Sequence, residues 1–259
     1  IYMMQSDADA ERLVNLGAPP ARVVVTGNLK YDLRQPEPGA LAAWLIRELK
    51  RAQRGPIIVA GSLAEGEERA VLDALAAIER EWPAALLIAA PRKPQTFDSA
   101  AREIEARGRV AVRRSALDLD LDRDGAVALD VPGAVLLLDS VGELAGLYAL
   151  ADAVFVGGSL VPVGGHNILE PAIVGRAPVF GPSMDNFKEM AARFREAGAG
   201  MEVADATELA AAWAGLLRDP EERERRGAAA KALVERYRGA TGAATERLSA
   251  LLPADRSAT

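Results

Sequence analysis

The sequence contains no cysteine and only one histidine, His166. The absence of cysteine excludes a scaffold held by disulfides and is typical of proteins from a reducing compartment. A single imidazole without any thiolate also argues against a zinc site, which needs several such ligands. We therefore expect neither a bound metal nor a resident cofactor.

Long apolar runs and a basic charge excess are missing as well. No apolar stretch approaches the roughly 20 residues that cross a bilayer, so we expect the chain as given to be soluble. The net charge of −6 argues against nonspecific binding to nucleic acid, which depends on clustered Lys and Arg. Core size is not limiting, because half of the 259 residues are hydrophobic.

Short apolar runs alternate with amphipathic stretches along most of the chain. This order predicts a Rossmann-like α/β fold, in which helices cover both faces of a parallel sheet. The expected strands are 1–5, 22–26, 56–60, 85–89, 109–112, 134–138, 153–156, 177–180 and 200–203. The expected helices are 6–16, 40–51, 67–81, 97–107, 142–150, 184–197, 207–217 and 220–237.

Residues 154–182 contain two glycine pairs, at 157–158 and 164–165, between two predicted strands. Glycine permits positive φ and close backbone approach, and a helix is expected to begin near Asn167. Its amide groups would face an anion on the glycine loops, and Glu170 would accept hydrogen bonds from sugar hydroxyls. His166 is expected to shape the loop first and to contact a ligand second. The open alternative is a tight connection whose glycines serve packing alone.

Polar or glycine-containing loops follow five of the predicted strands. Parallel α/β sheets bind ligands at the carboxyl ends of their strands, so these loops are candidate ligand contacts. They begin at Gly61, Pro91, Asp139, Gly157 and Gly181. Arg92 could stack on a base or pair with a phosphate, and the alternative is a solvated loop arginine.

An acidic run resembles a calcium-binding loop but lacks its last ligand. Asp120, Asp122, Asp124 and Gly125 match the opening of an EF-hand loop, whereas Val131 stands where a glutamate is required. We expect a solvated loop or hairpin here.

Four segments resemble, in order and spacing, those of the bacterial Kdo transferases, which move 3-deoxy-D-manno-octulosonic acid (Kdo) from CMP-Kdo onto lipid A. They are QSDADAERLVNLGAPPARVVVTGNLKYD (5–32), GSLAEGEE (61–68), LIAAPRKPQTF (87–97) and VGGSLVPVGGHNILEPAIVGRAPVFGPSMDNFKEM (156–190). The chain departs from the family pattern at Leu63, Ala64, Lys93 and Val163.

The resemblance implies the C-terminal nucleotide-binding domain of a GT-B glycosyltransferase. Residues 39–259 would form this donor domain, and residues 1–38 would be a remnant of the N-terminal acceptor domain plus a hinge. The residues implied to hold CMP are Pro91, Arg92, Val141, Gly142, Glu143, Leu144, Asn167, Ile168, Leu169 and Glu170, with Ser62, Gly164, Gly165 and His166 as weaker candidates.

The resemblance also implies a division of labour with an N-terminal half. That half would carry the general base, the lipid A precursor site and the membrane association, at the cytoplasmic face of the bacterial inner membrane. Because the sequence opens directly in a strand, we expect a fragment that binds CMP-Kdo without turning it over. Two alternatives stay open. One is a nucleotide-sugar epimerase acting on UDP sugars with His166 or Glu143 as acid or base, and the other is a non-catalytic nucleotide-binding module.

Overall fold

The computed structural model describes residues 1–117, 119 and 128–251, and the chain divides into two compact units. The first consists of Ile1–Arg34 together with the C-terminal stretch that begins at Ala232. The second is Gln35–Lys231. The predicted division at residue 38 concerns the two domains of the whole protein and stays a prediction.

The second unit is built on a parallel sheet, as predicted. Within the described residues this sheet has seven strands in the order β5-β6-β4-β3-β7-β8-β9. Its strands are β3 (Ile57–Leu63), β4 (Leu86–Pro91), β5 (Val110–Arg113), β6 (Ala134–Leu137), β7 (Ala153–Val156), β8 (Pro178–Phe180) and β9 (Met201–Glu202). Strands β4, β5 and β6 lie on one side of β3 in the sheet, and β7, β8 and β9 lie on the other side. The loops after β3 and β7 therefore flank a topological switch point, where such sheets bind ligands.

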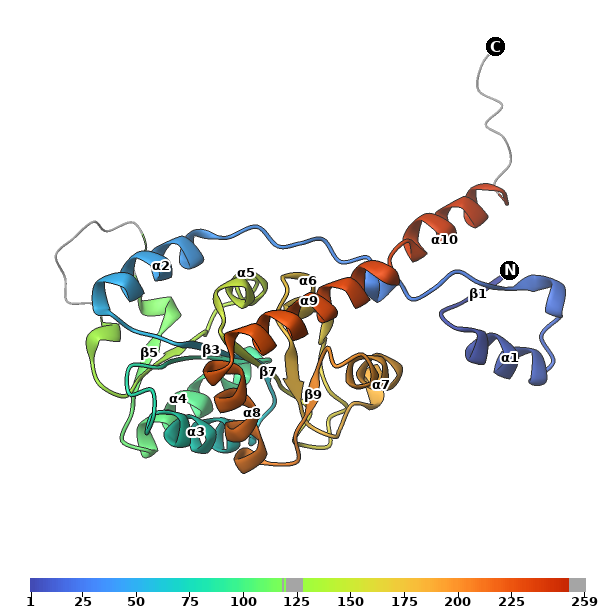
Figure 1. Cartoon of the computed structure of the whole chain (residues 1–259). Coiled ribbons are helices and arrows are strands. Elements are labelled where there is room, and N and C mark those ends of the chain that lie inside the picture. The colour runs from blue at the N-terminus through green and yellow to red at the C-terminus, as the bar shows by residue number, and fades with distance from the viewer. Residues whose placement is uncertain (118, 120–127, 252–259) are drawn as a thin grey trace, which may run out of the picture. The chain divides into compact units, whose positions relative to one another are not determined.

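Helices cover both faces of this sheet. Figure 1 shows α3, α4 and α8 on one face and α2, α5 and α6 on the other. The helices are α2 (Ala40–Ala52), α3 (Glu67–Ile78), α4 (Phe97–Ala106), α5 (Leu144–Leu147), α6 (Leu169–Ile173), α7 (Lys188–Glu196), α8 (Ala206–Arg218) and α9 (Pro220–Arg236). The core between the sheet and α3, α4 and α8 includes Phe155 and Trp213, both fully buried. Burial on both faces explains why the strands are apolar without alternation.

Several elements differ from the sequence prediction, and the helix expected over 184–197 begins only at Lys188, after a 3-10 turn. The helix expected over 142–150 is only one turn, α5, followed by a 3-10 turn. The helix expected near Asn167 begins at Leu169, whose N–H donates to the Asn167 side-chain oxygen at 3.2 Å. Strand β3 continues to Leu63, past the expected end at residue 60, through a register shift between Ala60 and Leu63.

The first unit contains a small parallel pair, β1 (Tyr2–Met4) with β2 (Val23–Val25). Helix α1 (Asp7–Asn15) connects them, and the Ser6 side chain caps it by accepting the Asp9 N–H at 3.2 Å. Helix α10 (Ala240–Ser249), which the sequence analysis did not predict, belongs to the same unit. The Asp32 carboxylate joins the two chain segments by accepting the N–H groups of Gly239 and Thr241. In the described part of the chain, the helices are too short or too polar to cross a membrane.

Candidate functional site

A cavity of about 370 Å³ opens at the carboxyl ends of the strands in the second unit. Residues from the end of β3 and from the connections after β4, β6, β7 and β8 converge on it, because those strand ends share one edge of the sheet. It is lined by Ser62, Arg92, Gly142, Leu144, Ala145, His166, Asn167, Glu170 and Phe187. Seven of these nine residues were candidates from the sequence, the exceptions being Ala145 and Phe187.

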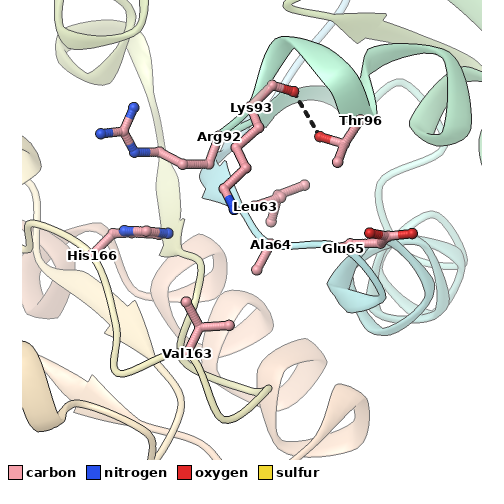
Figure 2. Close-up of a pocket in the computed structure, with 8 residues that line it drawn as sticks. All are labelled: Leu63, Ala64, Glu65, Arg92, Lys93, Thr96, Val163 and His166. Atoms are coloured by element: carbon pink, nitrogen blue, oxygen red, sulfur yellow. Dashed lines mark hydrogen bonds between the residues drawn. The ribbon is translucent and has the colours of Figure 1, made fainter.

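A second cavity of about 190 Å³ shares Arg92 and His166 with the first. Figure 2 shows its lining, which is Leu63, Ala64, Glu65, Arg92, Lys93, Thr96, Val163 and His166. The two shared residues stand at the junction of the two compartments. Sequence analysis had not proposed Glu65 or Thr96 for the site.

The loop after β4 holds Arg92 and Lys93 in a fixed backbone. The Arg92 N–H donates to the Leu63 carbonyl at 2.8 Å, and the Thr96 hydroxyl donates to the Lys93 carbonyl at 2.8 Å. Lys93 is extended, as residues before a proline usually are. Across the described residues, neither the Arg92 guanidinium nor the Lys93 ammonium forms an ion pair or a side-chain hydrogen bond. Two cations thus remain available to an anion.

Glu170 is a half-buried carboxyl group at the base of the larger cavity. Burial raises its pKa, while the hydrogen bond from Asn167 and the charge of Arg92 act in the opposite direction. The Asn167 amide donates to Oε1 at 3.3 Å, which leaves Oε2 for other donors. Glu170 is therefore suited to accept hydrogen bonds from ligand hydroxyls.

Burial, together with the nearby charges of Arg92 and Lys93, lowers the pKa of the His166 imidazole and so favours its neutral form. The ring lies against Gly158, where a Cβ would stand 2.7 Å from His166 Cδ2. Any side chain at position 158 would displace the imidazole. The position of the His166 ring therefore depends on a glycine at position 158.

The most extensively bonded side chain near the site is Glu67, in the first turn of α3 and 1% exposed. Its Oε2 accepts the N–H groups of Ala64 at 2.8 Å and Gly158 at 2.6 Å. Its Oε1 accepts those of Ser159 at 2.9 Å and Leu160 at 2.8 Å. Glu67 thereby ties the loop after β3 to the loop after β7. Sequence analysis missed this role, for which the only local signal was an acid following Gly66 at a helix start.

Three amides of the glycine loops have hydrogen-bond partners within the chain. The Gly158 N–H is bonded to Glu67, the Gly164 N–H to Ser183 Oγ at 3.0 Å, and the Gly165 N–H to the Gly158 carbonyl at 2.7 Å. These bonds hold the shape of the loop, and the ligand contacts expected of Gly164, Gly165 and the amides near Asn167 stay predictions. Helix α6, whose N-terminal end is expected to face the anion, is five residues long.

Several candidate residues lie beside the cavities without lining them. Ile168 and Leu169 are fully buried in the core, and Pro91 is the buried last residue of β4. Val141 is 80% exposed. Glu143 is engaged by Arg114, with 2.9 Å between Nη2 and Oε1. Their contacts with CMP stay a prediction.

No cluster of three or more His, Asp or Glu side chains suited to a metal occurs in the described ranges 1–117 and 128–251. Asp120, Asp122, Asp124 and Gly125 of the EF-hand-like run lie outside the described residues. Metal independence stays a prediction.

Comparison with known proteins supports a specific family. A family model described as 3-deoxy-D-manno-octulosonic-acid transferase (kdotransferase) matches residues 1–33. The chain is 35% identical over 248 residues to the 3-deoxy-D-manno-octulosonic acid transferase of Bordetella pertussis, covering 92% of this chain and 54% of the relative. It is 34% identical to the enzyme of that name from Haemophilus influenzae, covering 91% and 53%. The chain belongs to the Kdo transferase family.

Within this family, the chain spans about half the length of the curated relatives it matches. The C-terminal CMP-Kdo binding domain of WaaA from Acinetobacter baumannii matches its structure with a TM-score of 0.62 and 29% identity, covering 73% of this chain and 96% of that domain. Anabaena HepE, solved with UDP and glucose, matches with a TM-score of 0.58 at 16% identity, covering 96% of this chain and 62% of that one. The second likeness concerns the fold alone. The fold is that of the C-terminal nucleotide-binding domain of a GT-B glycosyltransferase, as predicted.

Proposed function

We propose that this chain is the donor-binding part of a Kdo transferase, an enzyme that moves Kdo from CMP-Kdo to a lipid A precursor in lipopolysaccharide synthesis. The observation that carries the proposal is the convergence on one cavity of Arg92, from the loop after β4, with His166 and Glu170, from the connection after β7. The family relationship supplies the identity of the nucleotide. The epimerase alternative has only fold likeness in its favour, since a putative UDP-N-acetylglucosamine 2-epimerase from Listeria monocytogenes is 15% identical.

Each of these side chains has a distinct task in the proposed binding mode. Glu170 accepts hydrogen bonds from the ribose hydroxyls, and Arg92 pairs with the single phosphate of CMP. Neutral His166, at the junction, donates one ring N–H to a phosphate oxygen. Asn167 orients the Glu170 carboxylate through the hydrogen bond already described.

The same contacts would favour the chemical step. When the bond between the anomeric carbon of Kdo and the phosphate oxygen breaks, CMP leaves with added negative charge on that oxygen. Fixed cations and N–H donors around the phosphate stabilise this charge more in the transition state than in the ground state. In this proposal Arg92 and His166 take that role without a metal ion.

We assign no general base to this chain. The glutamate that activates the acceptor hydroxyl is proposed to lie in the N-terminal half of the whole protein, with the lipid A precursor site and the membrane association at the inner membrane. The chain then binds CMP or CMP-Kdo without turnover, and residues 39–259 are the functional donor domain.

Calorimetric titration with CMP, UDP and AMP, in the presence of chelator, tests the proposal. We expect binding that is selective for CMP and is weakened about tenfold or more by Arg92→Ala and by Glu170→Ala, since each removes a charged hydrogen-bonding group. Matched controls are Arg102→Ala and Glu105→Ala, two exposed residues of α4 that line neither cavity.

A preference for UDP would favour the epimerase alternative instead. Equal loss of affinity in the α4 controls would contradict the assignment of Arg92 and Glu170. Rejoining the chain to the N-terminal half of a relative and finding binding without Kdo transfer would favour the non-catalytic module.

A further inference from the structure

The two cavities differ in size and chemistry. The larger one contains Glu170, Asn167 and Ser62, the groups suited to a ribose and its nucleobase, and its volume of about 370 Å³ lies in the range typical of ligand pockets. The smaller, of about 190 Å³, is lined by Leu63, Ala64 and Val163 beside the polar Glu65, Lys93 and Thr96. It is too small for a nucleotide but has the mixture of apolar and polar groups found in sugar sites.

The order of the compartments matches the order of groups in a nucleotide-activated sugar with one phosphate. In such a donor the phosphate stands between the nucleoside and the sugar. Arg92 and His166 line both cavities, so a phosphate bound there has the larger compartment on one side and the smaller on the other. A donor lying across the junction would fill both.

Lys93 is the only cationic side chain of the smaller cavity that does not also line the larger one. Figure 2 shows its ammonium directed inward among the labelled residues, while the Arg92 guanidinium extends away from it and the Glu65 carboxylate points outward. The hydrogen bond from Thr96 and the prolines at 91 and 94 fix the Lys93 backbone. The backbone thus fixes where the Lys93 side chain starts, and its ammonium can pair with an anionic group of the sugar.

On the basis of the proposed function, on which this inference rests, we propose that the smaller cavity is the sugar subsite and that Lys93 pairs with the carboxylate of the sugar acid. Leu63, Ala64 and Val163 contact the carbon skeleton of the sugar. Lys93, one of the positions where this chain departs from the family pattern, then determines specificity for an acidic sugar in this chain.

The test compares CMP with CMP-Kdo, titrated calorimetrically without acceptor. The variant Lys93→Met keeps the length of the side chain and removes its charge, and Lys50→Met, on the exposed end of α2, is the matched control. We expect Lys93→Met to weaken CMP-Kdo binding about fivefold to tenfold, as for the loss of one partly solvated charged contact, and to leave CMP binding within twofold. Lys50→Met should change neither.

Equal weakening of CMP and CMP-Kdo by Lys93→Met would place the lysine on the phosphate and overturn the subsite. So would an unchanged affinity for both ligands. If the unaltered chain binds CMP but binds CMP-Kdo no more tightly, the subsite is wrong while the proposed function stands. If it binds neither, the proposed function itself fails.

Discussion

Gly61 illustrates how single residues shape the site. A Cβ at this position would stand 2.0 Å from Tyr148 Oη, 2.9 Å from its Cζ and 3.1 Å from Leu144 Cδ2. Tyr148 is fully buried, and burial, together with the charge of Glu170, raises the pKa of its phenol. The strand end is thus closed by a neutral aromatic ring that only glycine accommodates.

We predict that Gly61→Ala destabilises the chain by about 1–3 kcal/mol, the usual effect of overpacking. The double variant Gly61→Ala/Tyr148→Phe should lose less than the sum of the two single variants, because phenylalanine removes the closest atom. Urea denaturation of all four proteins measures the coupling. Strict additivity would show that the phenol oxygen is not the obstacle.

At the scale of elements, the Glu67 carboxylate connects the start of α3 to the loop after β7 through four backbone N–H donors. Glu67→Gln should cost about 2–3 kcal/mol of unfolding free energy, because an amide NH₂ would face N–H groups that lose their acceptor. It should also weaken CMP binding by displacing His166 through Gly158. Urea denaturation and calorimetry check the two effects.

The neighbouring residue Glu68 provides the control for the Glu67→Gln variant. It is buried as well, but its Oε1 has no hydrogen-bond partner among the described residues, and burial raises its pKa. A raised pKa means that the folded protein loses stability as pH rises from about 4.5 through the folded value, and the loss is complete above it. Glu68→Gln removes this loss, so the variant should gain stability relative to the unaltered chain at pH 8 and not at pH 4. A gain that persists at low pH would contradict this origin.

The sequence predicted the alternating elements and most of the cavity lining, because apolar strands and polar strand ends are local patterns. Ser62, Arg92, His166 and Glu170 meet as expected, since the carboxyl ends of parallel strands share one edge. The Glu67 contacts span 91 to 93 residues for the loop after β7, and no local pattern encodes such pairs. Sequence reasoning likewise could not tell that Ile168 and Leu169 point into the core, because an apolar residue beside a glycine loop is compatible with either role.

At the scale of the whole molecule, the first unit joins the N-terminal segment Ile1–Arg34 to the C-terminal segment that begins at Ala232. Asp32 accepts the Gly239 N–H at 2.6 Å and the Thr241 N–H at 2.5 Å, one on each oxygen. Burial acts to raise the pKa of Asp32, but the hydrogen bonds from Thr241 and Gly239 prevail and lower it. The Asp32 carboxylate therefore adds to the stability of the fold above about pH 3.8. This stabilisation is lost as pH falls through the lowered pKa of the folded state.

We predict that Asp32→Asn lowers amide hydrogen-exchange protection in residues 1–34 and 232–251 and leaves the strands of the second unit protected, because an asparagine retains only one of the two acceptor oxygens. Mass-spectrometric exchange at pH 7 measures both units at once. Asp98→Asn, an exposed residue of α4, is the control. Uniform loss of protection in both units would mean that they unfold together.

The internal carboxylate of Glu67 also bears on how a ligand is received. It occupies, from within the protein, the position on the loop after β7 that a bound anion would otherwise fill, and so it fixes the loop before any ligand arrives. The conformational entropy of that loop is then lost during folding and not during binding. Ligand affinity therefore reflects the contacts of Arg92, His166 and Glu170 with little offset from loop ordering, and the site should bind by lock-and-key complementarity rather than by induced fit.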